Sequence, residues 1–455
     1  MATQKTIFIV ITKGFITRNI IRSGVLEELK KSGARIVILF LNTRKKELPQ
    51  YLVDEFADGQ VIVEVVPPQV TSKAHRAFLF FSGLLVYNRV NRKIRYAIYS
   101  RSMFLLFLEN LLFASLEKIG FLKKLARFIE RTFFSSNFYG SYFDKYTPDV
   151  VFSTSVISKL DIDVMKEAHA RGIRTVSMPK VWDNITTRFY RYAPDKLIVQ
   201  NGEMKREAAR VQSISSNRIV VTGFPQFDWY RRPEIIQDRE TFLKSLGLDP
   251  KRKLIVWGST GRWTPDDGNI SDMLVKSLGD DTLISNCSLL IRSHYSDAQH
   301  RRFDKYKGTP NVYIDESFSN SEFFRDNTDP RREEIIHFIN TMYHADVVVT
   351  LCSTLTLDAF CFDKPVINTA FKDLFNNKGE DISTVLYEHD HYQPILELDS
   401  IDLVFSEKEL FESLNIYLKD STMKEGNRKK VLDRLCYKVD GNSSKRVAEA
   451  ILSLT

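Results

Sequence analysis

Two hydroxyl-bearing residues in the second half of the chain stand where a phosphate could bind. Residues 347–350 form a short β-branched run, which predicts a buried strand, and Ser353 and Thr354 follow before a helical apolar pattern over 355–362. A helix N-terminus presents unpaired N–H groups and the positive end of the helix dipole, and both attract anions. We therefore expect Ser353 and Thr354 to begin this helix and to contact a phosphate. An ordinary helix cap is the alternative that the pair by itself leaves open.

Three other predicted strands of the same half also end in polar residues. These strands cover residues 253–257, 288–291 and 311–314. The candidate binding residues after them are, in chain order, Gly258, Ser259, Thr260 and Arg262, then Arg292 and His294, then Glu316. Because the carboxyl ends of parallel strands share one edge of a sheet, four such endings predict a single binding site.

The first half begins with a predicted buried strand over residues 6–11, and two cations follow it. Lys13 and Arg18 lie at or just beyond the carboxyl end of this strand, where α/β folds place ligands. The single Gly14 in this turn does not make a dinucleotide-binding fingerprint. We therefore assign Lys13 and Arg18 to the acceptor side of the predicted site without inferring a bound dinucleotide.

A second polar loop of the first half combines a large aromatic residue with a carboxylate. It follows the predicted strand 174–178 and contains Trp182, Asp183 and Asn184. Since this loop should face the second half, Asp183 is the best candidate for a general base, and Trp182 and Asn184 are candidates for acceptor binding. The alternative is that Asp183 caps the local turn beside Asn184.

Strand and helix patterns alternate along most of the chain, which predicts an α/β protein with mostly parallel sheets. A chain of 455 residues is too long for one ordinary core, so we expect two domains. The first covers about 1–230 and includes a helical insertion over about 72–146. A linker over 231–250 leads to the second domain, 251–455, which ends in helices.

The insertion over 72–146 differs from the rest of the chain because it mixes Phe, Leu and Tyr with Lys and Arg at helical spacing. It contains no run of about 18 uncharged apolar residues, so no transmembrane helix is expected. A basic, aromatic amphipathic surface suits the interface of an anionic membrane. Packing of these helices on the sheet is the alternative, and the two are compatible.

The composition of the chain limits the classes of binding partner and the cellular compartment that we expect. The net charge of +8 and the pI of about 9.0 favour an anionic partner, and no nucleic-acid-binding motif is present, so nucleic acid is not expected. The four cysteines are scattered without metal-binding spacing, as in a reduced cytoplasmic protein. The only close histidine pair, His389 and His391, does not make a metal site, so we expect no metal and no cofactor.

The segment ADVVVTLCSTLTLDAFCFDKPVIN, which begins at Ala345, resembles a strand-helix-strand signature. Bacterial surface-polysaccharide glycosyltransferases, CDP-glycerol glycerophosphotransferases and the UDP-N-acetylglucosamine epimerase group share that signature. The segments VWDNITT and VVTGFPQFD resemble parts of bacterial glycosyltransferase-like proteins. The resemblance covers most of the chain from about Asp149 onward. It implies the GT-B architecture, in which two Rossmann-like domains face each other across a cleft.

The resemblance also implies roles for the candidate residues of the second half. Ser353 and Thr354 would hold the donor diphosphate, and Asp358 would orient them or bind a ribose or sugar hydroxyl. The turn from Gly258 to Arg262 would line the donor, and Arg262 or Arg292 would neutralise the leaving diphosphate. His294 would donate to a phosphate or to the sugar. The donor is then a substrate, and no metal is needed.

Three activities agree with this resemblance. The first hypothesis is a glycosyltransferase that moves a sugar from a nucleotide-activated donor to a lipid-linked surface glycan, working in the cytoplasm on the inner face of the cell membrane. The second is a polyol-phosphate transferase of the CDP-glycerol type, whose relatives offer additional histidines in the cleft. The third is a sugar-nucleotide epimerase, which has no acceptor. Inversion or retention at the sugar stays open.

Overall fold

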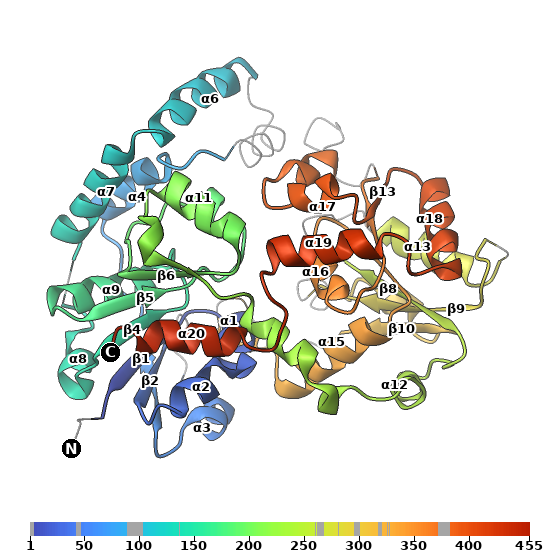
Figure 1. The fold of residues 1–455 in the computed structure, drawn as a ribbon, viewed down its shortest axis with the longest axis horizontal. Coiled ribbons are helices and arrows are strands. Elements are labelled where there is room, and N and C mark those ends of the chain that lie inside the picture. Colours follow the sequence, from blue (N-terminus) through green and yellow to red (C-terminus); the bar gives the residue numbers. More distant parts are fainter. Residues whose placement is uncertain are drawn as a thin grey trace.

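The computed structural model describes residues 4–41, 47–88, 103–135, 137–259, 261, 268–280, 282–294, 301–316, 321–324, 326, 328–371 and 383–455. Two parallel sheets dominate it, one in each half of the chain, and helices cover their faces (Figure 1). This confirms the predicted fold class. The domain boundaries proposed from the sequence stay predictions.

The first sheet has seven strands in the order β3-β2-β1-β4-β5-β6-β7. Its strands are β1 (Thr6–Ile11), β2 (Arg35–Leu41), β3 (Val61–Val66), β4 (Val150–Ser153), β5 (Arg174–Ser177), β6 (Lys196–Val199) and β7 (Ile219–Val221). All of their pairings are parallel. Strand β1 is buried at every position, which explains why its sequence is a continuous apolar run.

The helices of the first half follow the expected alternation with strands. They are α1 (Gly14–Ile16), the π-helical η1 (Thr17–Val25), α2 (Leu26–Lys30), α3 (Gln50–Phe56), α4 (Lys73–Gly83), α6 (Met103–Glu117), α7 (Gly120–Phe133), α8 (Gly140–Tyr146), α9 (Lys159–Ala170), α10 (Asn184–Thr187) and α11 (Gly202–Gln212). Short 3₁₀ turns lie at η2 (Ser216–Arg218), η3 (Pro225–Arg231) and η4 (Pro233–Ile235). Gly33 has a φ of 75°, a left-handed conformation that favours glycine after a helix.

The second sheet has six parallel strands in the order β10-β9-β8-β11-β12-β13. They are β8 (Lys253–Gly258), β9 (Cys287–Arg292), β10 (Val312–Asp315), β11 (Val347–Thr350), β12 (Val366–Thr369) and β13 (Asp402–Val404). The helices of this half are α12 (Arg239–Ser245), α13 (Gly268–Ser277), η6 (Asp304–Tyr306), α15 (Arg332–His344), α16 (Leu355–Phe360), η7 (Ser383–Glu388), α17 (Gln393–Glu397), α18 (Glu407–Lys419), α19 (Glu425–Leu435) and α20 (Ser443–Leu452).

Strand order reverses at one point in each sheet, and these points locate the ligand crevices. In the first sheet the reversal lies between β1 and β4, and in the second it lies between β8 and β11. At such a point the two strands are followed by connections that run over opposite faces of the sheet. A crevice therefore opens between these connections, at the carboxyl ends of the two strands. The predicted donor residues after β8 and β11 therefore lie at the switch point of the second sheet.

The short segment η3 joins the two halves. Its residues Phe227 and Tyr230 share one apolar core cluster with Leu197 of the first sheet and Leu254 of the second. The carboxylate of Asp228 accepts hydrogen bonds from the first two N–H groups of α20, at 3.0 and 2.7 Å. Helix α20, which the sequence division assigns to the second domain, thereby packs on the first sheet (Figure 1).

The helical insertion projects from the first half. Helices α4, α7 and α8 lie along this half, and α6 extends beyond its body (Figure 1). Residues 89–102 and 136 of the predicted insertion lie outside the described residues. Among the helices that the structure describes, none combines the length and the apolar character needed to cross a membrane.

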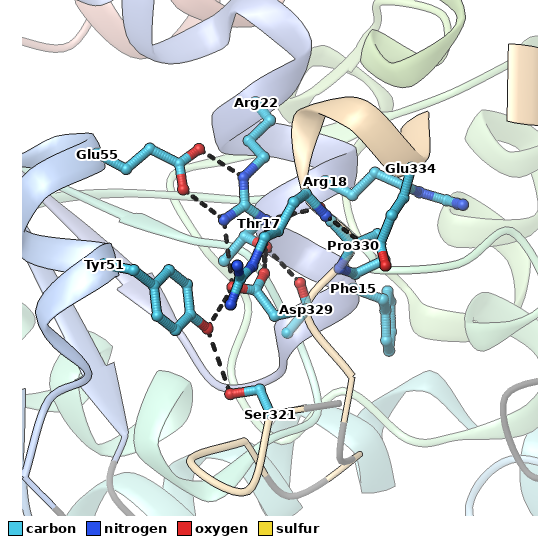
Figure 2. A network of polar contacts seen from close by, with 12 residues as sticks. Phe15, Thr17, Arg18, Arg22, Tyr51, Glu55, Ser321, Asp329, Pro330 and Glu334 are labelled. Carbon is cyan, nitrogen blue, oxygen red and sulfur yellow. Dashed lines mark hydrogen bonds and ion pairs between the residues drawn. The ribbon is translucent and has the colours of Figure 1, made fainter. Parts of the chain in front are cut away.

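A buried ion pair holds the start of the first half against a loop of the second half (Figure 2). The guanidinium of Arg22 binds the carboxylate of Asp329, and their side chains are 3% and 0% exposed. Arg22 also donates to Glu55 at 2.6 Å and to the carbonyl oxygen of Pro330 at 2.8 Å. Tyr51 donates to Asp329 at 2.7 Å. Each buried charge is thus paired and hydrogen-bonded, which burial requires.

The same loop lies against the turn after β1. The carboxylate of Asp326 accepts hydrogen bonds from the backbone N–H groups of Gly14 and Phe15, at 3.0 and 3.3 Å. A Cβ atom at Gly14 would lie 1.5 Å from the carbonyl oxygen of Thr328, so only glycine fits this contact. The carboxyl end of β1 is therefore fixed to the second half.

We predict that Asp329→Ala lowers the free energy of unfolding by about 3–5 kcal/mol, because it leaves the buried guanidinium of Arg22 with an incomplete set of partners. Urea denaturation followed by circular dichroism measures this change. Glu412→Ala is the control, since Glu412 pairs with Lys408 on the surface and its loss should cost less than about 0.5 kcal/mol. Equal effects of the two variants would contradict the assigned role of Arg22–Asp329.

Candidate active site

The predicted phosphate-binding hydroxyls lie at the start of α16. Thr354 is the N-cap residue of this helix. Its side chain is exposed and makes no capping hydrogen bond. Ser353 Oγ instead accepts a hydrogen bond from the N–H of Leu355 at 3.2 Å. The side chain of Thr354 therefore does not act as an ordinary helix cap, and its predicted contact with a phosphate stays a prediction.

The end of β8 lies directly beside this helix. Gly258 pairs with Thr350, whose hydroxyl donates to the carbonyl oxygen of Gly258 at 2.9 Å. A Cβ atom at Gly258 would lie 2.3 Å from the side chain of Leu355, so glycine permits the close approach of strand and helix. Gly258 at the end of β8 therefore lies beside the turn that follows β11, as predicted.

The end of β9 completes the same edge. The N–H of Ser259 donates to the carbonyl oxygen of Arg292 at 3.1 Å, and Ser259 Oγ accepts from the N–H of His294 at 3.0 Å. Because β8, β9 and β11 are neighbours in the sheet, Ser259, His294 and Ser353 lie on one edge, as predicted. Thr260 and Arg262 lie outside the described residues.

Two charged candidates have partners within the second half. The guanidinium of Arg292 forms a buried ion pair with Asp315, and Arg292 lies over the ring of Phe338 at 4.5 Å. Glu316 pairs with Lys307 at 3.2 Å near the surface. The charge of Arg292 is therefore balanced by Asp315. That pairing weakens its predicted role of neutralising a diphosphate, although this role stays a prediction.

Asp358 connects the donor edge to η3. It accepts a hydrogen bond from the hydroxyl of Tyr230. Its predicted role toward Ser353 and Thr354, or toward a ribose or sugar hydroxyl, stays a prediction. Burial raises the pKa of Asp358, while the nearby positive charges of Arg18 and Arg292 oppose that rise. The positive charge of Arg18, in the first half of the chain, thus favours the ionised form of Asp358 on α16.

A pair of lysines lies at the facing edge of the first sheet. Burial and the neighbouring charge of Lys13 lower the pKa of Lys180 to about 8. Asp161 lies close enough to attract Lys180, and burial raises the pKa of this carboxyl to about 7. One oxygen of Asp161 accepts from Ser153 at 2.8 Å, and the other has no hydrogen-bond partner within the described residues.

Sequence reasoning identified Lys13 but missed Lys180 and Asp161. Lys180 stands in the same loop as Asp183, directly after the strand that ends at Ser177, so its position was a usable signal. Asp161 lies inside α9, and only the hydroxyl-rich run between β4 and α9 pointed to it. The interaction between Lys13 and Lys180 joins the ends of β1 and β5, which no local pattern reveals.

The predicted base, Asp183, is half-buried in the loop after β5. It accepts a hydrogen bond from Asn184 Nδ2 at 3.0 Å, and its side chain does not cap α10. Burial raises the pKa of Asp183, and Lys180 and Arg188 partly offset this effect. A carboxylate with a raised pKa is suited to accept a proton near neutral pH.

Trp182 borders a cavity between the two halves. Its ring contacts the ring of His391 edge to face, with centroids 4.9 Å apart. The cavity has a volume of about 400 Å³ and is lined by residues of both halves, among them Asn201 and Gln393. The loop that carries Asp183 therefore does face the second half, as its sequence position predicted.

The family of the protein follows from a comparison with family models. The model of CDP-glycerol:poly(glycerophosphate) glycerophosphotransferases matches residues 167–453, which is more than half of the chain, so the protein belongs to this family. It is therefore a transferase, and the resemblance deduced from the sequence is confirmed. No curated protein matches the sequence.

Solved structures confirm the GT-B fold. The wall teichoic acid polymerase TagF, soaked with CDPG, is 14% identical with a TM-score of 0.54, covering 99% of this chain and 88% of that one. The UDP-GlcNAc 2-epimerase of Neisseria meningitidis, bound to UDP-GlcNAc, is 12% identical with a TM-score of 0.56, covering 98% and 100%. The S. aureus MnaA–UDP structure is 11% identical with a TM-score of 0.55, covering 99% and 98%.

We predict that the amine of Lys180 titrates near pH 8, well below an ordinary lysine. Lys13→Gln should raise the pKa of Lys180, because it removes the neighbouring positive charge. Competitive acetylation at a series of pH values, read by peptide mass spectrometry, gives the titration curve. Lys408, an exposed lysine of the second half, serves as the internal reference. A curve for Lys180 that coincides with that of Lys408 would contradict the arrangement.

Proposed function

We propose that the protein transfers a glycosyl group from a nucleotide-activated donor to a hydroxyl group of a surface-glycan acceptor. The observation that carries this proposal is the position of Asp183. It is a carboxylate with a raised pKa, held in a loop that faces the second half, whose strand ends carry the donor candidates. Family membership and the nucleotide ligands of the similar structures support the choice of donor class.

The donor would bind at the switch point of the second sheet. The start of α16 offers the exposed hydroxyl of Thr354 and the neighbouring Ser353 to the diphosphate. Gly258 keeps this position open to a ligand, because it carries no side chain between β8 and α16. His294, on the same edge, would donate a hydrogen bond to the phosphate or to the sugar.

The acceptor would bind from the first half. Asp183 would take the proton of the acceptor hydroxyl while its oxygen forms a bond to the anomeric carbon. The bond between that carbon and the diphosphate oxygen breaks, and the electron pair leaves with the nucleotide. Such a base is needed if configuration inverts. Arg18, Lys13 and Lys180 would balance the negative charge of the leaving group, so the transfer would need neither a metal nor a cofactor.

The second candidate is polyol-phosphate transfer from a CDP-linked donor, and the matched family favours it. In this reaction the acceptor oxygen attacks phosphorus and a nucleoside monophosphate leaves with the electron pair. The lysine pair at the first sheet suits such a phosphate. In the part of the chain that the structure describes, His294 is the one histidine that lies within two residues of the carboxyl end of a strand. Relatives of the CDP-glycerol type offer additional histidines in the cleft, so this scarcity favours sugar transfer. An epimerase would bind the donor and need no acceptor.

We expect one class of nucleotide-linked donor to raise the melting temperature. A ligand at about 100 times its Kd stabilises the native state by about 2.7 kcal/mol. The panel consists of UDP-, GDP-, CMP- and dTDP-sugars and CDP-glycerol, read by differential scanning fluorimetry. Stabilisation by CDP-glycerol alone would favour the second candidate. Absence of stabilisation by every donor would overturn both transferase proposals and the epimerase alternative.

We expect Ser353→Ala combined with Thr354→Ala to reduce donor binding by about 1.5–3 kcal/mol for each hydrogen bond to the charged diphosphate. Isothermal titration with the stabilising donor measures this loss. Ser421→Ala is a matched control, because Ser421 is exposed and lies in the turn between α18 and α19, not at one of the four strand ends. Unchanged affinity in the double variant would remove Ser353 and Thr354 from the donor site.

Asp183→Asn should preserve donor binding and lower kcat by about 10²–10⁴-fold, which is the usual contribution of a general base. In the unmodified protein, kcat should fall as the pH drops through the raised pKa of Asp183, because the protonated carboxyl cannot accept a proton. A coupled assay of nucleotide release across pH tests both statements. Normal turnover by Asp183→Asn would exclude it as the base.

A further inference from the structure

The loop that carries Asp183 is long and has little regular structure of its own. It runs from the end of β5 at Ser177 to the start of β6 at Lys196, and between them the described chain forms only the short helix α10. A proton acceptor on such a loop needs support from outside, because a displacement of about 1 Å can lower turnover about a hundredfold. The residues that hold this loop therefore determine where Asp183 lies.

One buried side chain, that of Gln212 at the end of α11, binds the loop at three points. Its Nε2 donates to the carbonyl oxygens of Ile185 and Arg188, at 2.6 and 2.8 Å. Its Oε1 accepts a hydrogen bond from the N–H of Tyr190 at 2.9 Å. Gln212 is fully buried, and Ile185 lies within α10, two residues after Asp183. Gln212 is therefore bound directly to the turn that carries the proposed base.

Gln212 is in turn held by the helical insertion, through Arg127 of α7. The guanidinium of Arg127 donates to the carbonyl oxygens of Tyr190 and Gln212, at 2.8 and 2.6 Å. It also lies over the ring of Phe189 at 5.1 Å. The guanidinium is planar and rigid, so two hydrogen bonds from one such group fix the positions of the two carbonyl groups relative to each other. Arg127 thereby joins the loop, the end of α11 and the insertion.

The residues directly after α10, which form a strap over 188–191, make further contacts with the insertion. Phe189 belongs to one small apolar cluster with Ala126 of α7. Arg191 forms an ion pair with Glu130 of α7 at 3.1 Å, and the two side chains are 10% and 1% exposed. The sequence left open whether the insertion packs on the first half, and α7 does so along this strap. The insertion thus supports the loop of the proposed base.

We propose that Gln212 and Arg127 are positioning residues for Asp183, so that the helical insertion takes part in catalysis by holding the proposed base. This inference rests on the proposed function, in which Asp183 accepts the proton of the acceptor hydroxyl. Gln212 fixes the turn itself, and Arg127 fixes Gln212 and the strap to α7. Both side chains act through the backbone of the loop and not on the reacting atoms.

Gln212→Met keeps the length of the side chain and removes its hydrogen bonds to the loop. We expect kcat for nucleotide release to fall by about 10–100-fold, because the base is displaced. The Kd of the stabilising donor, measured by isothermal titration, should not change, since the donor edge lies in the second half. Amide hydrogen exchange over residues 183–187 should become faster.

Gln60→Met is the matched control for the loss of a bridging glutamine. Gln60 Nε2 also donates to two carbonyl oxygens, those of Lys30 and Ala34, at 2.7 and 2.8 Å. These groups lie before the start of β2, at the edge of the first sheet opposite to the carboxyl ends of its strands. Gln60→Met should lower the melting temperature and leave kcat unchanged. An equal loss of kcat in Gln60→Met and Gln212→Met would overturn the proposal.

The pH dependence of kcat separates positioning from a general loss of stability. Burial raises the pKa of Asp183, and the charges of Lys180 and Arg188 oppose that rise. Burial and the charge of Asp183 raise the pKa of Tyr190, so this phenol stays neutral. A looser loop hydrates the carboxyl and should move the pKa of Asp183 down toward its ordinary value. The acid limb of kcat should therefore move to lower pH, whereas a smaller folded fraction would leave the limb in place.

Arg127→Met tests the contribution of the insertion. It should lower kcat and move the acid limb in the same direction as Gln212→Met, and Arg127→Lys, which can restore one of the two hydrogen bonds, should recover part of kcat. Arg218→Met is the control, because it removes a neighbouring cation that donates to the carbonyl oxygen of Ala193, outside the strap, at 3.1 Å. Arg218→Met should leave kcat and its acid limb unchanged.

The outcomes distinguish this inference from the proposed function. If Asp183→Asn is inactive but Gln212→Met and Arg127→Met retain kcat and its acid limb, the inference is wrong and the proposed base stands. If Arg127→Met alone retains them, the part assigned to the insertion is wrong. Normal turnover by Asp183→Asn would exclude the proposed base and this inference with it.

Discussion

The buried pair of Arg22 and Asp329 is the interaction on which the relative position of the two halves depends. Neither charge is exposed, so each needs the other to offset its lost hydration. The pair fixes the loop before α15 against the start of the chain, where Asp326 binds the first N–H groups of α1. These N–H groups are therefore not available to a phosphate, and a ligand at β1 must rely on side chains such as Lys13.

A second constraint comes from η3, where consecutive residues serve three different partners. Asp228 caps α20, Trp229 donates to the carbonyl oxygen of Arg22 at 2.7 Å, and Tyr230 donates to Asp358. The turn at Gly223, Phe224 and Pro225 follows β7, the last strand of the first sheet along the chain, and leads directly into the residues of η3. They tie the last helix, the buried ion pair and the donor edge into one structure.

The sequence predicted the fold well because its signals are local. Continuous apolar runs specify buried parallel strands, and the bounds predicted for β1 and β11 agree with those observed. It predicted the convergence of the four strand ends for the same reason, since parallel strands share an edge. It could not predict that Arg292 pairs with Asp315, or that Lys180 approaches Lys13. Those contacts join separate strands, and no spacing along the chain encodes them.

The distribution of charge indicates how the two halves would divide the chemistry. In the described part of the second half, Arg292 is balanced by Asp315, so this half adds little net positive charge at the switch point. The positive charge near this boundary comes from the first half, from Arg18, Lys13 and Lys180. The charge of Arg18 lowers the pKa of Asp358 in the second half. A diphosphate on the second half would therefore be stabilised by cations of the first. In the proposed reaction Arg22–Asp329 and η3 would hold these cations in position relative to the donor edge, which is the condition for electrostatic preorganisation.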